Sequence, residues 1–128
     1  MMISPDDRHF FNTEGYLLIR NFHDLETEIL PIQRDIYEII GLVAQRHGIA
    51  LSRDGFSPDS FDEGFYTLLA HDRKYAGEVY DLTKQIPSFL RLISNQRSEE
   101  LFRELRGTDH AGIGAASYGI RIDNPNED

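Results

Sequence analysis

Two charged residues near the C-terminus have a spacing that suits an anion-binding surface. Arg121 and Asp123 lie two residues apart in an alternating run over residues 117–123, so both would project from the same side of an extended segment. A guanidinium group holds a carboxylate through two parallel hydrogen bonds. The spacing therefore marks Arg121, with Asp123 beside it, as a candidate contact for an anionic ligand. The alternative interpretation of the same pattern is the solvent-exposed face of an edge strand that binds no ligand.

The histidines have no metal-ligand spacing. A mononuclear iron oxygenase uses two histidines and one carboxylate, usually with a His-x-Asp or His-x-Glu pair. Two residues after each histidine stands an apolar residue, an arginine or a glycine, and no His-Glu-x-x-His helix is present. We therefore predict surface or capping histidines and neither a metal ligand nor a catalytic residue. The five histidines are His9, His23, His47, His71 and His110.

The glycine-rich run at residues 112–117 is similar to a phosphate-binding loop but lacks its last glycine. We expect a helix before this run and a strand after it, whereas phosphate binding requires a helix N-terminus after the loop. The run is therefore interpreted as a hinge between a helix and a sheet.

The elements that position these residues are mostly helical. Isoleucines and a valine recur at steps of three and four from Ile29 to Val43, which predicts one long helix with a single apolar stripe. Shorter helices are expected at residues 4–14, 61–72, 74–86, 88–93 and 98–106. Two strands are expected, at residues 16–20 and 117–123. In the second strand Tyr118, Ile120 and Ile122 would face the core.

Composition narrows the function class. The chain has 128 residues, with 13 Lys and Arg against 22 Asp and Glu, so its formal net charge is −9. This acidic balance argues against nonspecific binding to nucleic acid or anionic lipid, and no apolar run is long enough to cross a membrane. The absence of cysteine removes disulfides and thiolate chemistry and fits a cytoplasmic protein.

Three stretches resemble the phytanoyl-CoA dioxygenase family, with the best match in a bacterial branch. They are residues 10–22, 80–87 and 118–128, and the first contains Gly15-Tyr16-Leu17-Leu18-Ile19-Arg20. The resemblance implies a double-stranded β-helix, or jelly-roll, oxygenase that uses Fe(II), 2-oxoglutarate and O₂. It implies a metal-binding His-x-Asp only beyond Asp128. By the same resemblance, Arg121, and less directly Asp123, would face the cosubstrate or substrate pocket.

The expected fold is therefore α+β: a mainly helical layer with one or two strands that forms the N-terminal part of a jelly roll. Residues 1–110 would be a helical buttress and residues 111–128 the start of a truncated sheet, together one partial domain. We expect this chain to be the N-terminal fragment of a dioxygenase that hydroxylates a small molecule or acyl thioester. The fragment alone would be inactive and would hold no cofactor of its own. The alternative is a non-catalytic binding module derived from that fold. Strand pairing or a homo-oligomer through the C-terminal strand would then cover the exposed edge.

Overall fold

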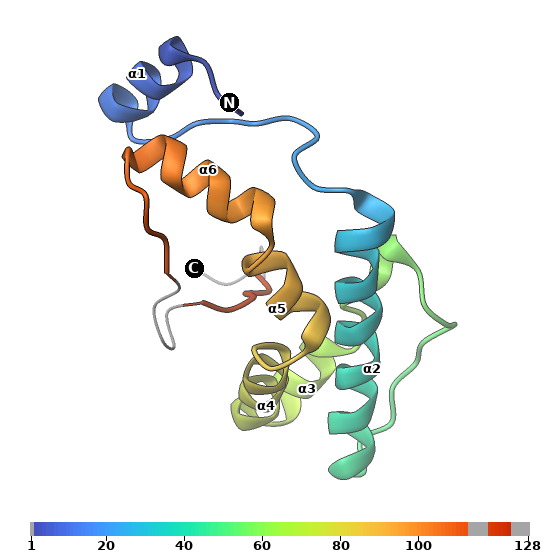
Figure 1. Cartoon of the computed structure of the whole chain (residues 1–128). Coiled ribbons are helices and arrows are strands. Elements are labelled where there is room, and N and C mark those ends of the chain that lie inside the picture. The colour runs from blue at the N-terminus through green and yellow to red at the C-terminus, as the bar shows by residue number, and fades with distance from the viewer. Residues whose placement is uncertain (1, 113–117, 124–128) are drawn as a thin grey trace.

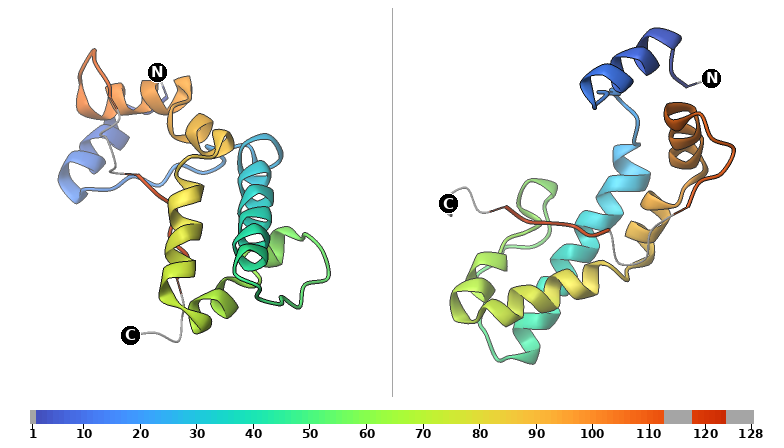
Figure 2. Two further views of the ribbon diagram at one scale, coloured as in Figure 1. Left: turned by 90° about the horizontal axis from the view of Figure 1, so that it is seen from below. Right: turned by 90° about the vertical axis from the view of Figure 1, so that its left-hand side faces the viewer.

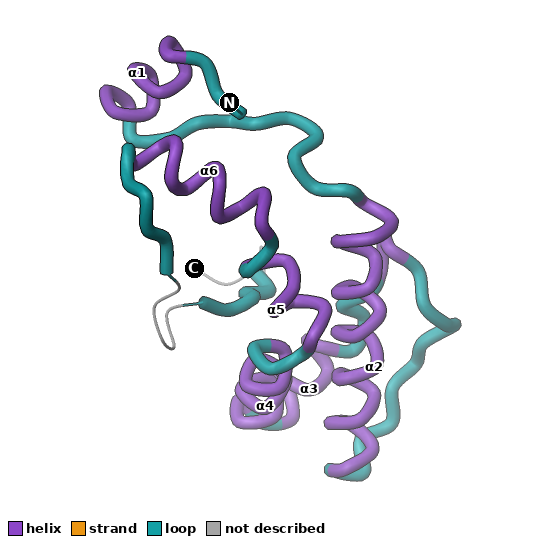
Figure 3. The backbone as a smooth tube through the Cα atoms, viewed as in Figure 1, coloured by secondary structure: helices purple, strands orange, loops and turns teal. Residues whose placement is uncertain are grey.

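The computed structural model describes residues 2–112 and 118–123, and in these residues the secondary structure is entirely helical (Figures 1 and 3). Its elements are α1 (Pro5–Glu14), a π-helical turn η1 (Leu25–Ile29), α2 (Leu30–Arg46), a 3-10 turn η2 (Pro58–Ser60), α3 (Phe65–His71), α4 (Arg73–Thr83), α5 (Pro87–Ile93) and α6 (Gln96–Arg106). None of the described helices is long and apolar enough to cross a bilayer.

The predicted α+β fold is wrong for the described part of the chain. Residues 16–20 and 118–123 form no strand, although both are rich in residues that favour sheets. Strand formation needs a neighbouring backbone, and these two segments pair neither with each other nor with another described segment. The remaining residues of the predicted sheet, 113–117 and 124–128, and the hinge predicted at residues 112–117 apart from Gly112, lie outside the described residues.

Helix α2 is the centre of the core, as its stripe predicts. Its buried residues follow the three- and four-residue spacing of one helix face and pack against α4 and α5. Pro31 stands in the first turn of α2, where its missing N–H costs nothing, and the π-helical turn precedes it. The buried residues of this helix are Ile32, Ile36, Ile39, Ile40, Val43 and Ala44.

Helices α1 and α6 form a second lobe beside this core (Figures 1 and 2). Neither helix has a buried residue, and the two pack against each other. The caps of α1 are as predicted: the Ser4 hydroxyl accepts the Asp7 N–H, and Gly15 ends the helix at φ 82°. Helix α6 begins earlier than predicted because Asn95, rather than Ser98, accepts the capping hydrogen bond.

Glu104 ties the start of the chain to α6. Its carboxylate accepts hydrogen bonds from the backbone N–H groups of Met2, at 2.8 Å, and Ile3, at 3.0 Å. These two N–H groups, Met2 first, lower the pKa of Glu104 because they stabilise its charged form. Ile3 is thereby held in a buried position, at 6% exposure.

Acidification should release this contact. Because the pKa of Glu104 is lower in the folded chain, its contribution to stability is present above the ordinary glutamate pKa. That contribution is lost as the pH falls through the lowered value. In an NMR titration from pH 7 to pH 3, we expect the Met2 and Ile3 amide signals to move together, with a midpoint below the ordinary glutamate range. Glu104→Gln should remove this titration, and an unchanged titration in the variant would contradict the contact.

Candidate functional site

Residues 118–123 lie along α3 and α4, where two tyrosines fix the backbone. The Tyr80 hydroxyl donates to the Ile122 carbonyl at 3.1 Å and accepts the Ile122 N–H at 3.3 Å. The Tyr66 hydroxyl donates to the Asp123 carbonyl at 2.6 Å. Tyrosine hydroxyls thus supply hydrogen bonds that a neighbouring strand would supply in a sheet.

The alternation predicted for this segment is confirmed even though the strand is not. Tyr118, Ile120 and Ile122 are half-buried and pack against the core. Arg121 and Asp123 are exposed on the other side and form an ion pair, with Arg121 Nε 2.5 Å from Asp123 Oδ1. Their side chains are 86% and 73% exposed, so this pair contributes little to stability and can exchange with another anion.

A cavity of about 400 Å³ lies between α3, α4 and residues 118–123, and we call it the α3–α4 cleft. Its size falls in the range of pockets that accept small organic ligands. Aromatic and small apolar residues form much of its lining, and three charged residues border it. The lining consists of Phe65, Tyr66, Leu69, Arg73, Ala76, Gly77, Tyr80, Arg121, Ile122 and Asp123.

The cleft brings together both predicted site residues and a third charge that the sequence did not indicate. Arg73 is the first residue of α4, exposed, and makes no ion pair or hydrogen bond with another described side chain. Two guanidinium groups, from Arg73 and Arg121, therefore border one cavity against the single carboxylate of Asp123. Because a carboxylate ligand can displace the exposed Asp123 side chain from Arg121, the cleft suits a small organic anion.

The opposite face of α4 is locked to α2, which fixes the position of the cleft wall. His47, the C-cap of α2, places Nε2 2.9 Å from Glu78 Oε1, and its ring stacks on Tyr75 with centroids 3.9 Å apart. Glu78 and Tyr75 face α2, while Ala76 and Gly77 line the cleft.

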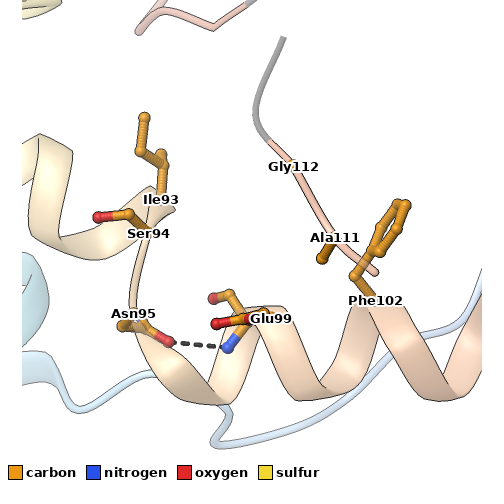
Figure 4. Close-up of a pocket in the computed structure, with 8 residues that line it drawn as sticks. Ile93, Ser94, Asn95, Glu99, Phe102, Ala111 and Gly112 are labelled. Carbon is orange, nitrogen blue, oxygen red and sulfur yellow. Dashed lines mark hydrogen bonds between the residues drawn. The ribbon is translucent and has the colours of Figure 1, made fainter. Parts of the chain in front are cut away.

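A second cavity, of about 480 Å³, lies where α5 meets α6 (Figure 4). The Phe102 ring stands at one side of it, and Asn95 at the other accepts the Ser98 N–H. Two further polar groups of the lining are engaged within the chain: the Ser94 hydroxyl donates to the Leu90 carbonyl and Glu99 pairs with Arg103. This cavity offers a ligand fewer free charges than the α3–α4 cleft.

Within residues 2–112 and 118–123, no three His, Asp or Glu side chains come together in a way that could hold a metal ion. The sequence resemblance places its iron ligands beyond Asp128, so this result does not bear on that site. No family model, no curated protein and no solved structure matches this chain. The dioxygenase resemblance consequently stays a prediction from the sequence.

Removing the Tyr80 hydroxyl should loosen residues 118–123. Tyr80→Phe leaves the N–H and carbonyl of Ile122 without their shared partner, at a cost of about 1–2 kcal/mol. Trypsin cleaves after arginine, so we expect faster cleavage after Arg121 in this variant than in the wild type. Tyr75→Phe is the matched control, because Tyr75 lies on the α2-facing side of the same helix. Equal cleavage rates in the two variants would contradict the docking role of Tyr80.

Proposed function

We propose that this chain is a helical binding module whose α3–α4 cleft takes a small organic anion bearing a carboxylate. One observation carries the proposal: Arg73, at the start of α4, and Arg121, in a distant segment, border the same cavity of about 400 Å³. Guanidinium groups recognise carboxylates through paired hydrogen bonds, and the aromatic lining covers the apolar part of such a ligand. The acidic net charge works against anion binding at long range, so the site depends on these two local charges.

The proposal concerns binding alone, because the residues that border the cleft suit an anion. It retains the predicted role of Arg121 as a ligand contact and adds Arg73, whereas Asp123 competes with the ligand for Arg121. We place the module in the cytoplasm, in keeping with a chain that has no cysteine.

Calorimetric titration with 2-oxoglutarate and with succinate tests the proposal, and uncharged succinamide serves as the control ligand. We expect both dicarboxylates to bind, with an affinity that falls as the salt concentration rises, and succinamide not to bind. If neither dicarboxylate binds at low salt, the proposal is contradicted.

Charge variants should alter the affinity in opposite directions. Arg73→Gln and Arg121→Gln should each weaken dicarboxylate binding about five- to tenfold, because each removes one exposed charged hydrogen-bonding group. Asp123→Asn should strengthen binding, because it removes the competing carboxylate beside Arg121. Arg91→Gln, on the exposed surface of α5, is the matched control and should leave the affinity unchanged. An affinity loss of the same size in Arg91→Gln would show that the cleft is not the binding site.

A further inference from the structure

A glycine lies in the middle of the α4 face that borders the α3–α4 cleft. Arg73, Gly77 and Tyr80 follow one another at steps of four and three residues, so they share one face of the helix, and all three line the cavity. A Cβ atom at Gly77 would meet no atom of another part of the chain within 4 Å. The space above the helix backbone is therefore open at this point, between a guanidinium group and a tyrosine ring.

Packing within the chain does not require a glycine at this position. Gly41, the glycine inside α2, differs because Arg53 Nη2 lies 2.5 Å from its Cβ position, so a guanidinium group fills that space. Gly77 has no such neighbour and no positive φ, and glycine inside a helix is less stable than alanine. What the missing side chain provides is access, since a ligand can lie directly against a bare backbone.

Three aromatic rings beside this opening form a continuous cluster. The ring centroid of Phe65 lies 5.7 Å from that of Tyr66, edge to face, and 5.4 Å from that of Tyr80. All three residues line the cleft. The two tyrosine hydroxyls donate to backbone carbonyls of residues 118–123, so the tyrosines offer a ligand mainly their ring surfaces. Aromatic rings pair favourably with a further ring, edge to face or offset.

We infer that the anion bound in the α3–α4 cleft carries an aromatic ring and that this ring lies over Gly77. The inference rests on the proposed function, in which Arg73 and Arg121 hold the carboxylate. A cavity of about 400 Å³ lies in the range of sites that bury drug-sized ligands, which leaves room for a ring beside the carboxylate. A flat ring fits between the aromatic cluster and the bare backbone of α4. Gly77 is then a specificity-determining residue that admits the ring, while the arginines bind the charge.

Two acids of similar size test the preference for a flat ring. Phenylacetate and cyclohexylacetate have the same charge and the same number of carbon atoms, but the cyclohexyl ring is puckered and has no π-system. In a calorimetric titration of the wild type, we expect phenylacetate to bind about three- to tenfold more tightly, because only its ring pairs with the aromatic cluster. Equal affinities for the two acids would overturn the inference.

Gly77→Leu tests the position of the ring. Leucine forms helices better than glycine and meets no neighbour here, so the melting temperature should not fall below that of the wild type. The new side chain occupies the space of the ring, and phenylacetate affinity should fall at least about tenfold. Succinate, which has no ring, should lose less than about twofold. Thr67→Leu, on the exposed surface of α3 and outside the cleft lining, is the matched control and should change neither affinity.

The two ligands separate failure of this inference from failure of the proposed function. If neither phenylacetate nor succinate binds the wild type, the proposed function is contradicted and the inference falls with it. If succinate binds and Gly77→Leu weakens both ligands equally, or weakens neither, only the position of the ring over Gly77 is overturned. A selective loss of phenylacetate in Gly77→Leu, absent from Thr67→Leu, is the result that we expect.

Discussion

Ile36→Asp is expected to abolish cooperative unfolding of the helical core. Ile36 is 2% exposed on the inner face of α2, and no described cation lies among the apolar residues around it. Burying an unpaired carboxylate there costs about 3–5 kcal/mol. A domain of this kind has only about 5–15 kcal/mol of stability in total. In a thermal melt followed by circular dichroism, the melting temperature should fall by at least about 10 °C, or the transition should be lost.

Leu42→Asp is the control for this substitution. Leu42 lies on the same helix but is 59% exposed, so the new carboxylate stays in water. Its effect should remain within about 0.5 kcal/mol. A cooperative melt of Ile36→Asp at the wild-type temperature would contradict the burial of the α2 stripe.

Gly64→Ala is expected to have the second largest effect on stability. Gly64 is the N-cap of α3 and has φ 97°, a conformation that costs a residue with a side chain about 1–2 kcal/mol. A Cβ atom there would lie 2.9 Å from Leu51 Cδ1 and 3.2 Å from Ile40 Cγ2. These two side chains would therefore also have to move to make room for it. The two contributions together should reduce the free energy of unfolding by about 2–4 kcal/mol. Denaturant unfolding measures this loss.

Gly48→Ala separates the two contributions. Gly48 also has a positive φ, at 66°, but no atom lies within 4 Å of its Cβ position. This control should lose only the conformational part, about 1–2 kcal/mol. Equal losses in the two variants would mean that Leu51 and Ile40 do not crowd residue 64. A larger loss at Gly64 would support its role in starting α3, which carries Phe65 and Tyr66 to the cleft.

Features that depend on local sequence were predictable. The burial of Ile36, Ile40 and Val43 follows from helical spacing alone, because residues three and four apart share one helix face. The caps at Ser4 and Gly107 also depend only on nearby backbone groups. Period-two burial at Tyr118, Ile120 and Ile122 was likewise predictable from the alternation.

Features that depend on a partner far away in the sequence were not predictable. The strand predicted at residues 118–123 is wrong because its alternation fixes which side chains face inward but not which backbone lies beside it. That neighbour is α4, through Tyr80, rather than a strand. Arg73 could not be assigned to the site, since only the packing of residues 118–123 against α3 and α4 brings it to the cavity of Arg121. Tyr80 lies in a stretch that carries the family resemblance, but nothing in its local sequence indicates a contact with Ile122.

The central claim, that the α3–α4 cleft binds a carboxylate, is tested most directly by following the arginine Nε–Hε signals during a titration with 2-oxoglutarate. NMR at low salt resolves individual side chains, and single arginine substitutions assign them. We predict that the signals of Arg73 and Arg121 shift together along one saturating curve while that of Arg91 stays in place. Absence of a shift at Arg73 and Arg121, or shifts confined to other arginines, would contradict the claim.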